Sequence, residues 1–137
     1  MGRKALKITA DTNVLLRSVL QDDPYQGPLA TETLNHADLI AIPLPVLCEY
    51  VWVLRRTYKE SASVVADSVE RLLSSPNVAV NKPAVEAGLA TLRAGGDFAD
   101  GVVAHEGQWL GAETFLTFDT KAATLLNSQG IPATLLS

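Results

Sequence analysis

Hydrophobic and polar positions alternate in short segments along this chain. Longer segments repeat apolar residues every three or four positions, as amphipathic helices do. We expect helices at residues 12–20, 25–37, 43–58, 63–73, 83–93, 98–110 and 121–127. Between them, short apolar runs have the length of strands, at residues 6–10, 38–42, 78–80, 114–117 and 131–135. Strands that alternate with helices favour an α/β domain with a mainly parallel sheet and helices on both faces.

Polar residues mark where several of these helices begin. Asp11, Asp97 and Asp119 each stand directly before a predicted helix, where an aspartate can accept a hydrogen bond from a free backbone N–H group. The pair Gly95-Gly96 ends the helix that precedes Asp97. No repeat, low-complexity stretch or long linker divides the chain. We therefore predict one domain over residues 1–137.

Composition adds the broad class. The chain has 137 residues, of which 47% are hydrophobic and 19% are charged, as in an ordinary globular protein. No apolar run approaches the roughly 18 residues of a membrane-spanning helix, and Asp11 comes too early for a signal peptide. The single cysteine, Cys48, cannot form an internal disulfide. We expect a cytoplasmic protein with no membrane partner.

The charge balance limits the kinds of partner. A formal net charge of −4 disfavours tight, nonspecific binding to long nucleic acid. It does not exclude a local nucleic-acid site, because carboxylates that hold a metal count as negative until the metal binds. The basic residues that could line one rim of such a site are Arg17, Arg55, Arg56, Lys59, Arg93 and Lys121.

Four carboxylates are the main candidates for chemistry: Asp11, Glu49, Asp100 and Asp119. Asp11 and Asp119 follow the first and fourth predicted strands, and α/β sheets build ligand sites at the carboxyl ends of their strands. Helix capping accounts for each of them equally well. Asp100 lies one turn into its helix, on nearly the same face as Asp97, where the helix dipole also favours an acid.

Glu49 is the carboxylate that structure alone explains least well. The residues three and four positions away on either side are all apolar. We therefore expect Glu49 to point inward, where an unpaired charge costs several kcal/mol. The structural alternative is a glutamate at the edge of the core that pairs with an arginine such as Arg55.

Acidic oxygen ligands without a histidine and cysteine set favour Mg²⁺ or Mn²⁺ over zinc. His36 and His105 have no ligand spacing with each other or with Cys48, and we expect both at the surface or half-buried. Trp52 and Trp109 are expected in the core or at an interface. The chain has no glycine-rich phosphate loop and no Gly-x-Ser-x-Gly nucleophile elbow.

Four segments together resemble a known family. They are residues 11–16, the helix that contains Glu49, residues 97–104 and residues 116–119. In this order and spacing they are similar to the motifs of PIN-domain ribonucleases. Within that family, the compact length and the amino-acid sequences of the motifs look most like VapC-type toxins of prokaryotic toxin–antitoxin pairs. The resemblance runs from about Leu6 to Ile131, which is nearly the whole chain.

The resemblance implies a three-layer α/β/α PIN-like domain whose central parallel sheet has five strands in the order 3-2-1-4-5. Strands one and four would then be neighbours, and the catalytic, metal-binding carboxylates would be Asp11, Glu49, Asp100 and Asp119. The resemblance also implies supporting roles for Asp97 as an auxiliary metal ligand and for Thr12, Asn13 and Thr117, which would orient ligands or bind water. One departure is Gly101, where the family more often has alanine, a change expected to loosen that helix.

The activity that the resemblance implies is Mg²⁺- or Mn²⁺-dependent cleavage of RNA by a homodimer that a cognate antitoxin inhibits. The antitoxin's basic side chains would reach into the acidic pocket. A metal held by the carboxylates would lower the pKa of a bound water, and the resulting hydroxide would attack the phosphodiester in line. Because the 2′-hydroxyl group is not the nucleophile, the products would carry 5′-phosphate and 3′-hydroxyl ends.

Two other functions do not fit these residues, and a third stays open. A phosphoacceptor signalling domain needs an acidic pair after strand one and an aspartate after strand three, but residues 77–82 contain no aspartate. A phosphatase of the haloacid-dehalogenase type needs a second aspartate where this chain has Asn13. A catalytically silent PIN-like module that binds RNA or protein stays open.

Overall fold

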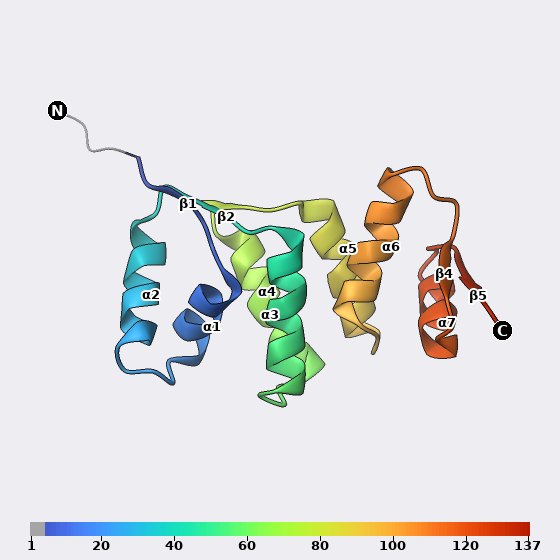
Figure 1. Cartoon of the computed structure of the whole chain (residues 1–137), viewed down its shortest axis with the longest axis horizontal. Helices are drawn as coiled ribbons and strands as arrows, with labels where there is room; N and C mark the ends of the chain where they lie inside the picture. Colours follow the sequence, from blue (N-terminus) through green and yellow to red (C-terminus); the bar gives the residue numbers. More distant parts are fainter. Residues whose placement is uncertain (1–4) are drawn as a thin grey trace. The chain divides into compact units, whose positions relative to one another are not determined.

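The computed structural model describes residues 5–137, which form seven helices and five strands (Figure 1). The strands are β1 (Lys7–Thr9), β2 (Leu39–Ala41), β3 (Val78–Ala79), β4 (Phe115–Thr117) and β5 (Ala133–Leu135). The helices are α1 (Thr12–Leu20), α2 (Gln26–His36), α3 (Leu44–Arg56), α4 (Ala62–Ser74), α5 (Lys82–Arg93), α6 (Phe98–Trp109) and α7 (Thr120–Ser128).

Each expected helix and strand is present in the predicted order, which confirms the α/β class. Helix α1 has the predicted bounds, Thr12–Leu20. The strands are shorter than the apolar runs that predicted them, so that β2, for example, covers three residues of the five in 38–42. Every strand pair within residues 5–137 is parallel, as expected.

The chain divides into two compact units, which are described separately. Unit 1 comprises the residues up to Lys59 together with Glu70–Val80, and unit 2 comprises Glu60–Val69 together with Asn81–Ser137. One of the three boundaries, between residues 69 and 70, falls within α4. That residues 1–137 form one domain stays a prediction.

Unit 1 is built on a three-stranded parallel sheet in which β2 is the central strand. Its register pairs Ile40 of β2 with Ile8 of β1 and with Val78 of β3. Helix α1 contacts both α2 and α3. Leu15 of α1 and Tyr50 of α3 are fully buried, so the amphipathic faces of these helices form the core of this unit.

Unit 2 combines a parallel pair of strands, β4 and β5, with the helices α5, α6 and α7 and the first part of α4 (Figure 1). Helix α7 contacts both strands, and the side chain of Asn127 exchanges two hydrogen bonds of 2.9 Å with the backbone of Ala133. Thr91 of α5 donates a hydrogen bond of 3.0 Å to Gln129, just beyond α7. These bonds fix the end of α7 against both β5 and α5.

Helices α5 and α6 pack closely because glycines face each other at their contact. A Cβ atom on Gly101 would lie 2.7 Å from the carbonyl oxygen of Ala87, and one on Gly88 would lie 2.7 Å from the ring of Phe98. Both distances are too short for a real side chain. The expectation that Gly101 loosens its helix is therefore replaced: α6 is continuous from Phe98 to Trp109, and Gly101 lets it approach α5.

The single five-stranded sheet of order 3-2-1-4-5 is not confirmed. The strands of residues 5–137 form a three-stranded sheet, β1-β2-β3, and a two-stranded sheet, β4-β5. These two sheets contain the neighbours 3-2-1 and 4-5 of the expected order. Over the same residues, no helix has both the length and the apolar character that a membrane span requires.

Candidate functional site

Three of the predicted site residues cap the helices that follow them. Asp11 accepts a hydrogen bond of 2.8 Å from the backbone N–H of Thr12, and Asp97 accepts one of 3.0 Å from that of Ala99. Asp119 accepts one of 3.1 Å at the start of α7. Each bond uses the Oδ1 atom. Since a carboxylate has two oxygens and about four acceptor sites, capping fixes these side chains without preventing a ligand from binding.

Unit 2 gathers three aspartates, Asp97, Asp100 and Asp119, which we call the acidic cluster. Asp100 is half-buried in the first turn of α6. Burial raises the pKa of its carboxyl group, and the negative charges of Asp97 and Asp119 raise it further. The fold thus brings residues 97, 100 and 119 within electrostatic reach of one another, although Asp119 is nineteen positions away from Asp100 in the sequence.

The chemistry of the acidic cluster fits a hard cation. Repulsion among carboxylates is relieved when a divalent cation binds between them, and oxygen-only ligands suit Mg²⁺ or Mn²⁺. Within residues 5–137, no three histidine, cysteine, aspartate or glutamate side chains are arranged so that they could hold a metal ion together.

Unit 1 carries the two remaining candidates, Asp11 and Glu49, and both are exposed. Asp11 lies between β1 and α1, as predicted from its position after the first apolar run. The prediction that Glu49 points inward is wrong. The buried face of α3 is formed instead by Leu47, Tyr50, Val51 and Leu54.

The exposed face of α3 explains this error. Pro45 and Trp52 lie on the same face as Glu49, and the side chain of Trp52 is 56% exposed. Their apolar character therefore did not indicate burial. Trp109 of α6 is 76% exposed, so neither tryptophan belongs to the core.

The three expected supporting residues differ in their surroundings. Thr12 is buried, and Asn13 is exposed. The Oγ1 atom of Thr117 accepts a hydrogen bond of 3.0 Å from the backbone N–H of Asp119. This bond fixes the chain at the point where it leaves β4, and with it the position of the Asp119 carboxylate.

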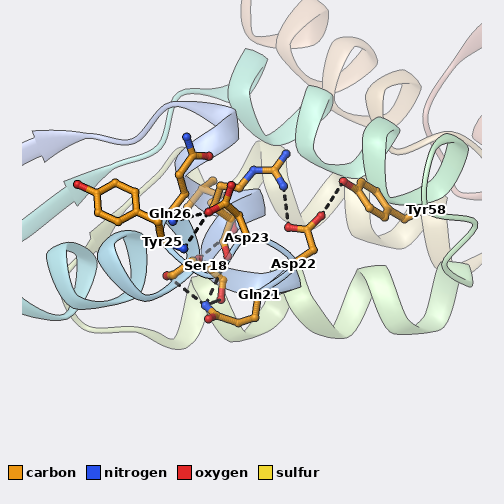
Figure 2. Close-up of polar contacts among 10 residues, drawn as sticks. Ser18, Gln21, Asp22, Asp23, Tyr25, Gln26 and Tyr58 are labelled. Atoms are coloured by element: carbon orange, nitrogen blue, oxygen red, sulfur yellow. Dashed lines mark hydrogen bonds and ion pairs between the residues drawn. The ribbon is translucent and has the colours of Figure 1, made fainter.

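Arg17 and Arg93, which were expected at a rim, form ion pairs with aspartates. Arg17 forms an ion pair of 2.6 Å with Asp22, whose second oxygen accepts a hydrogen bond of 3.3 Å from the hydroxyl group of Tyr58 (Figure 2). Arg93 forms an ion pair of 2.9 Å with Asp67. The link between Asp22 and Tyr58 spans 36 positions, so no local spacing in the sequence indicates it.

The remaining polar candidates do not add metal ligands. His36 is exposed and His105 is half-buried, as expected. The Nε2 atom of His105 is buried and has no hydrogen-bond partner within residues 5–137. Cys48 is half-buried on α3. A pocket of about 180 Å³ in unit 1 is lined mainly by apolar side chains, and no carboxylate lines it.

Comparison with known proteins identifies a family. Residues 8–125, which make up most of the chain, match the PIN domain family. The matched range includes every predicted carboxylate, from Asp11 to Asp119. A search of curated proteins finds no significant match.

Proposed function

The chain belongs to the PIN domain family, and from this premise we propose that it is an endoribonuclease that hydrolyses RNA with Mg²⁺ or Mn²⁺. The PIN domain is generally a nuclease fold, its nucleases bind RNA, and its members usually use these two cations. The observation that carries the proposal is the acidic cluster. Its central carboxyl group, that of Asp100, has a raised pKa because of burial and of two neighbouring negative charges.

The residues proposed to hold the cation come from both units. Asp100 and Asp119 of the acidic cluster would act with Asp11 and Glu49 of unit 1, and Asp97 would be an auxiliary ligand. This assembly requires β1 and β4 to be neighbours in one five-stranded sheet of order 3-2-1-4-5 within a single domain. That sheet order is part of the proposal, and the membership of the PIN family supports it.

The protein's own groups would then position the reaction. When bound, Mg²⁺ or Mn²⁺ would lower the pKa of a water molecule and stabilise negative charge on the phosphoryl oxygens. The capping hydrogen bonds of Asp11 and Asp119 hold these carboxylates in fixed directions. Thr12 and Asn13, which follow Asp11 directly, are proposed to orient ligands or water, and Thr117 supports Asp119 through its backbone.

We further propose that the protein acts in the cytoplasm as a VapC-type toxin, as a homodimer that a cognate antitoxin inhibits. The sequences of the motifs support this subfamily. Electrostatics supports the mode of inhibition, because a basic antitoxin side chain placed near Asp100 would relieve the same repulsion that a cation relieves. Expression of the wild type would then arrest growth, whereas expression of Asp11→Asn would not.

The direct test is RNA cleavage by purified protein. We expect the wild type to cleave RNA with Mn²⁺ but not with EDTA, and we expect Asp11→Asn and Asp100→Asn to be inactive. Asp67→Asn is the matched control, since Asp67 is an exposed acid of unit 2 outside the acidic cluster. Sequencing of the product ends should show 5′-phosphate groups. Products with 2′,3′-cyclic phosphate ends would exclude the proposed mechanism.

A silent PIN-like binding module is the second candidate, and one observation favours it: residues 5–137 contain no complete group of three metal ligands. Titration calorimetry with Mn²⁺ separates the two functions. The nuclease should bind Mn²⁺, and Glu49→Gln should bind it more weakly. A wild type that binds RNA, but neither binds Mn²⁺ nor cleaves RNA, would be the silent module.

A further inference from the structure

The exposed face of α3 carries a line of three residues that differ in chemistry. Glu49, Trp52 and Arg56 are spaced by three and four positions, so they lie on one face of the helix. All three are exposed. We call this line the α3 stripe. It places an exposed aromatic ring between a candidate metal ligand and a positive charge.

The end of α3 concentrates positive charge in an acidic protein. Three of the chain's eleven lysines and arginines, Arg55, Arg56 and Lys59, lie within five positions, whereas the net charge is −4. Within residues 5–137, neither Arg56 nor Lys59 takes part in an ion pair. The helix dipole accounts for arginines in a last turn. It does not account for the exposure of Trp52 or for Lys59 beyond the helix.

Lys59 occupies a backbone conformation that favours glycine. Its φ angle is 57°, in the left-handed region that residues with a Cβ atom rarely adopt. The preceding residue, Tyr58, donates a hydrogen bond to Asp22 (Figure 2). The segment that carries Lys59 is therefore tied to the loop after α1, and a lysine stands where glycine would fit with less strain.

An aromatic side chain flanked by cations is the combination that binds single-stranded nucleic acid, through base stacking and phosphate contacts. We propose that the α3 stripe is the track along which single-stranded RNA enters the nuclease site. Trp52 stacks on a base, and Arg56 and Lys59 contact phosphates. The track rests on the proposed function for the identity of its ligand.

The dimensions and the charge suit this ligand. From Glu49 to Arg56 the helix rises about 10 Å, since each residue adds about 1.5 Å. This length corresponds to about three stacked nucleotides at about 3.4 Å each. Because the chain as a whole is acidic, RNA approaches most favourably at the basic end of α3. A base stacked on Trp52 would then place a phosphate close to Glu49.

The first test measures binding of a labelled single-stranded oligouridine by fluorescence anisotropy in EDTA, where no metal-dependent cleavage occurs. Trp52→Ala should weaken binding by about 5- to 150-fold, the range expected when one stacked base is lost. Trp52→Phe should recover part of that loss. Trp109→Ala is the matched control, because Trp109 is even more exposed but lies in unit 2, and it should bind like the wild type. Equal binding by Trp52→Ala and the wild type overturns the proposal.

The second test separates charge from folding. Lys59→Gly removes a charge and suits the left-handed backbone, so the variant should melt no lower than the wild type. Its affinity for RNA should fall. The negative slope of log affinity against log salt concentration should become shallower by about 0.7, the value for one lost phosphate contact on a single strand. Arg56→Ala should do the same. Arg71→Ala, at the exposed end of α4, should leave the slope unchanged.

The outcomes distinguish this inference from the proposed function. If the wild type cleaves RNA and Trp52→Ala binds RNA as tightly as the wild type does, the RNA track is refuted and the nuclease function stands. A wild type that binds but does not cleave RNA, with weaker binding by Trp52→Ala, refutes the nuclease and keeps the track. Sedimentation tests whether a second copy of the chain occupies the stripe instead. If Trp52→Ala binds RNA normally but is monomeric where the wild type is a dimer, the stripe is a contact between two copies.

Discussion

The fold places aspartates in opposite electrostatic surroundings at two sites in this molecule. In unit 1, Asp22 forms an ion pair with Arg17 and accepts a hydrogen bond from Tyr58 (Figure 2). Asp23 accepts hydrogen bonds of 2.9 and 2.8 Å from two backbone N–H groups at the start of α2. In unit 2, Asp100 faces the negative charges of two other aspartates. The charges of Asp22 and Asp23 are thus compensated, whereas the charge of Asp100 is opposed by its neighbours.

The two pKa shifts express this contrast. Hydrogen bonds from the backbone of Gln26 and Tyr25 lower the pKa of Asp23, so ionised Asp23 stabilises the fold. Burial, followed by the charges of Asp97 and Asp119, raises the pKa of Asp100, so ionised Asp100 destabilises it. The helix dipole favours an acid in this first turn, but burial and two neighbouring negative charges oppose its ionisation. The proposed cation would relieve this repulsion.

The largest expected effect is the loss of RNA cleavage on substitution of Asp100. Even residues that only orient metal ligands typically change activity about 10- to 100-fold, so Asp100→Asn should lower the cleavage rate by more than about 100-fold. The rate is measured on one labelled RNA at saturating Mn²⁺. Asp22→Asn and Asp67→Asn, which alter compensated acids, should keep a rate within a few fold of the wild type. Equal losses in all three variants would remove the contrast.

The close contact between α5 and α6 predicts the next effect. Gly101→Ala places a Cβ atom 2.7 Å from a backbone oxygen, and overpacking of this kind costs about 1–3 kcal/mol. Gly107→Ala is the matched control in the same helix, because its Cβ would meet only one atom, at 3.8 Å. Both variants gain about 1 kcal/mol of helix propensity. The difference between their free energies of unfolding, measured with urea, therefore isolates the clash.

Asp100→Asn should also stabilise the protein in the absence of metal. The raised pKa of Asp100 means that the folded state resists ionisation of this group, so wild-type stability falls as pH rises from 3.8 through the raised pKa. The advantage of Asp100→Asn should be complete at neutral pH and vanish below 3.8. Thermal melts in EDTA measure it. Adding Mn²⁺ should raise the melting temperature of the wild type but not that of the variant.

Much of the fold follows from the sequence because the signals for it are local. The apolar spacing that predicts α1 and the aspartates that cap α1, α6 and α7 act within a few residues, and the structure contains each of them. The close α5–α6 contact is different. Gly101 gives no local sign that it faces Gly88, because the contact depends on how two helices cross.

The site follows from the sequence less completely. The proximity of Asp119 to Asp100 depends on tertiary packing in unit 2, and no spacing in the chain indicates it. The prediction for Glu49 fails for another reason: apolar neighbours indicate burial only where they face the core, and Trp52 is exposed. The order of the five strands came only from the family resemblance. No residue in β1 or β4 specifies its neighbour by itself.

The smallest expected effect concerns the compensated group. Asparagine caps a helix nearly as well as aspartate, so Asp23→Asn keeps the hydrogen bonds to α2 and removes only the charge. Because the pKa of Asp23 is lowered, its contribution to stability is present above 3.8 and is lost as pH falls through the lowered value. Asp23→Asn should therefore melt slightly below the wild type at neutral pH, and Asp100→Asn above it. In thermal melts at successively lower pH, the melting temperatures of the wild type and the two variants should converge. If both variants melt below the wild type at neutral pH, Asp23 and Asp100 do not have opposite effects on stability.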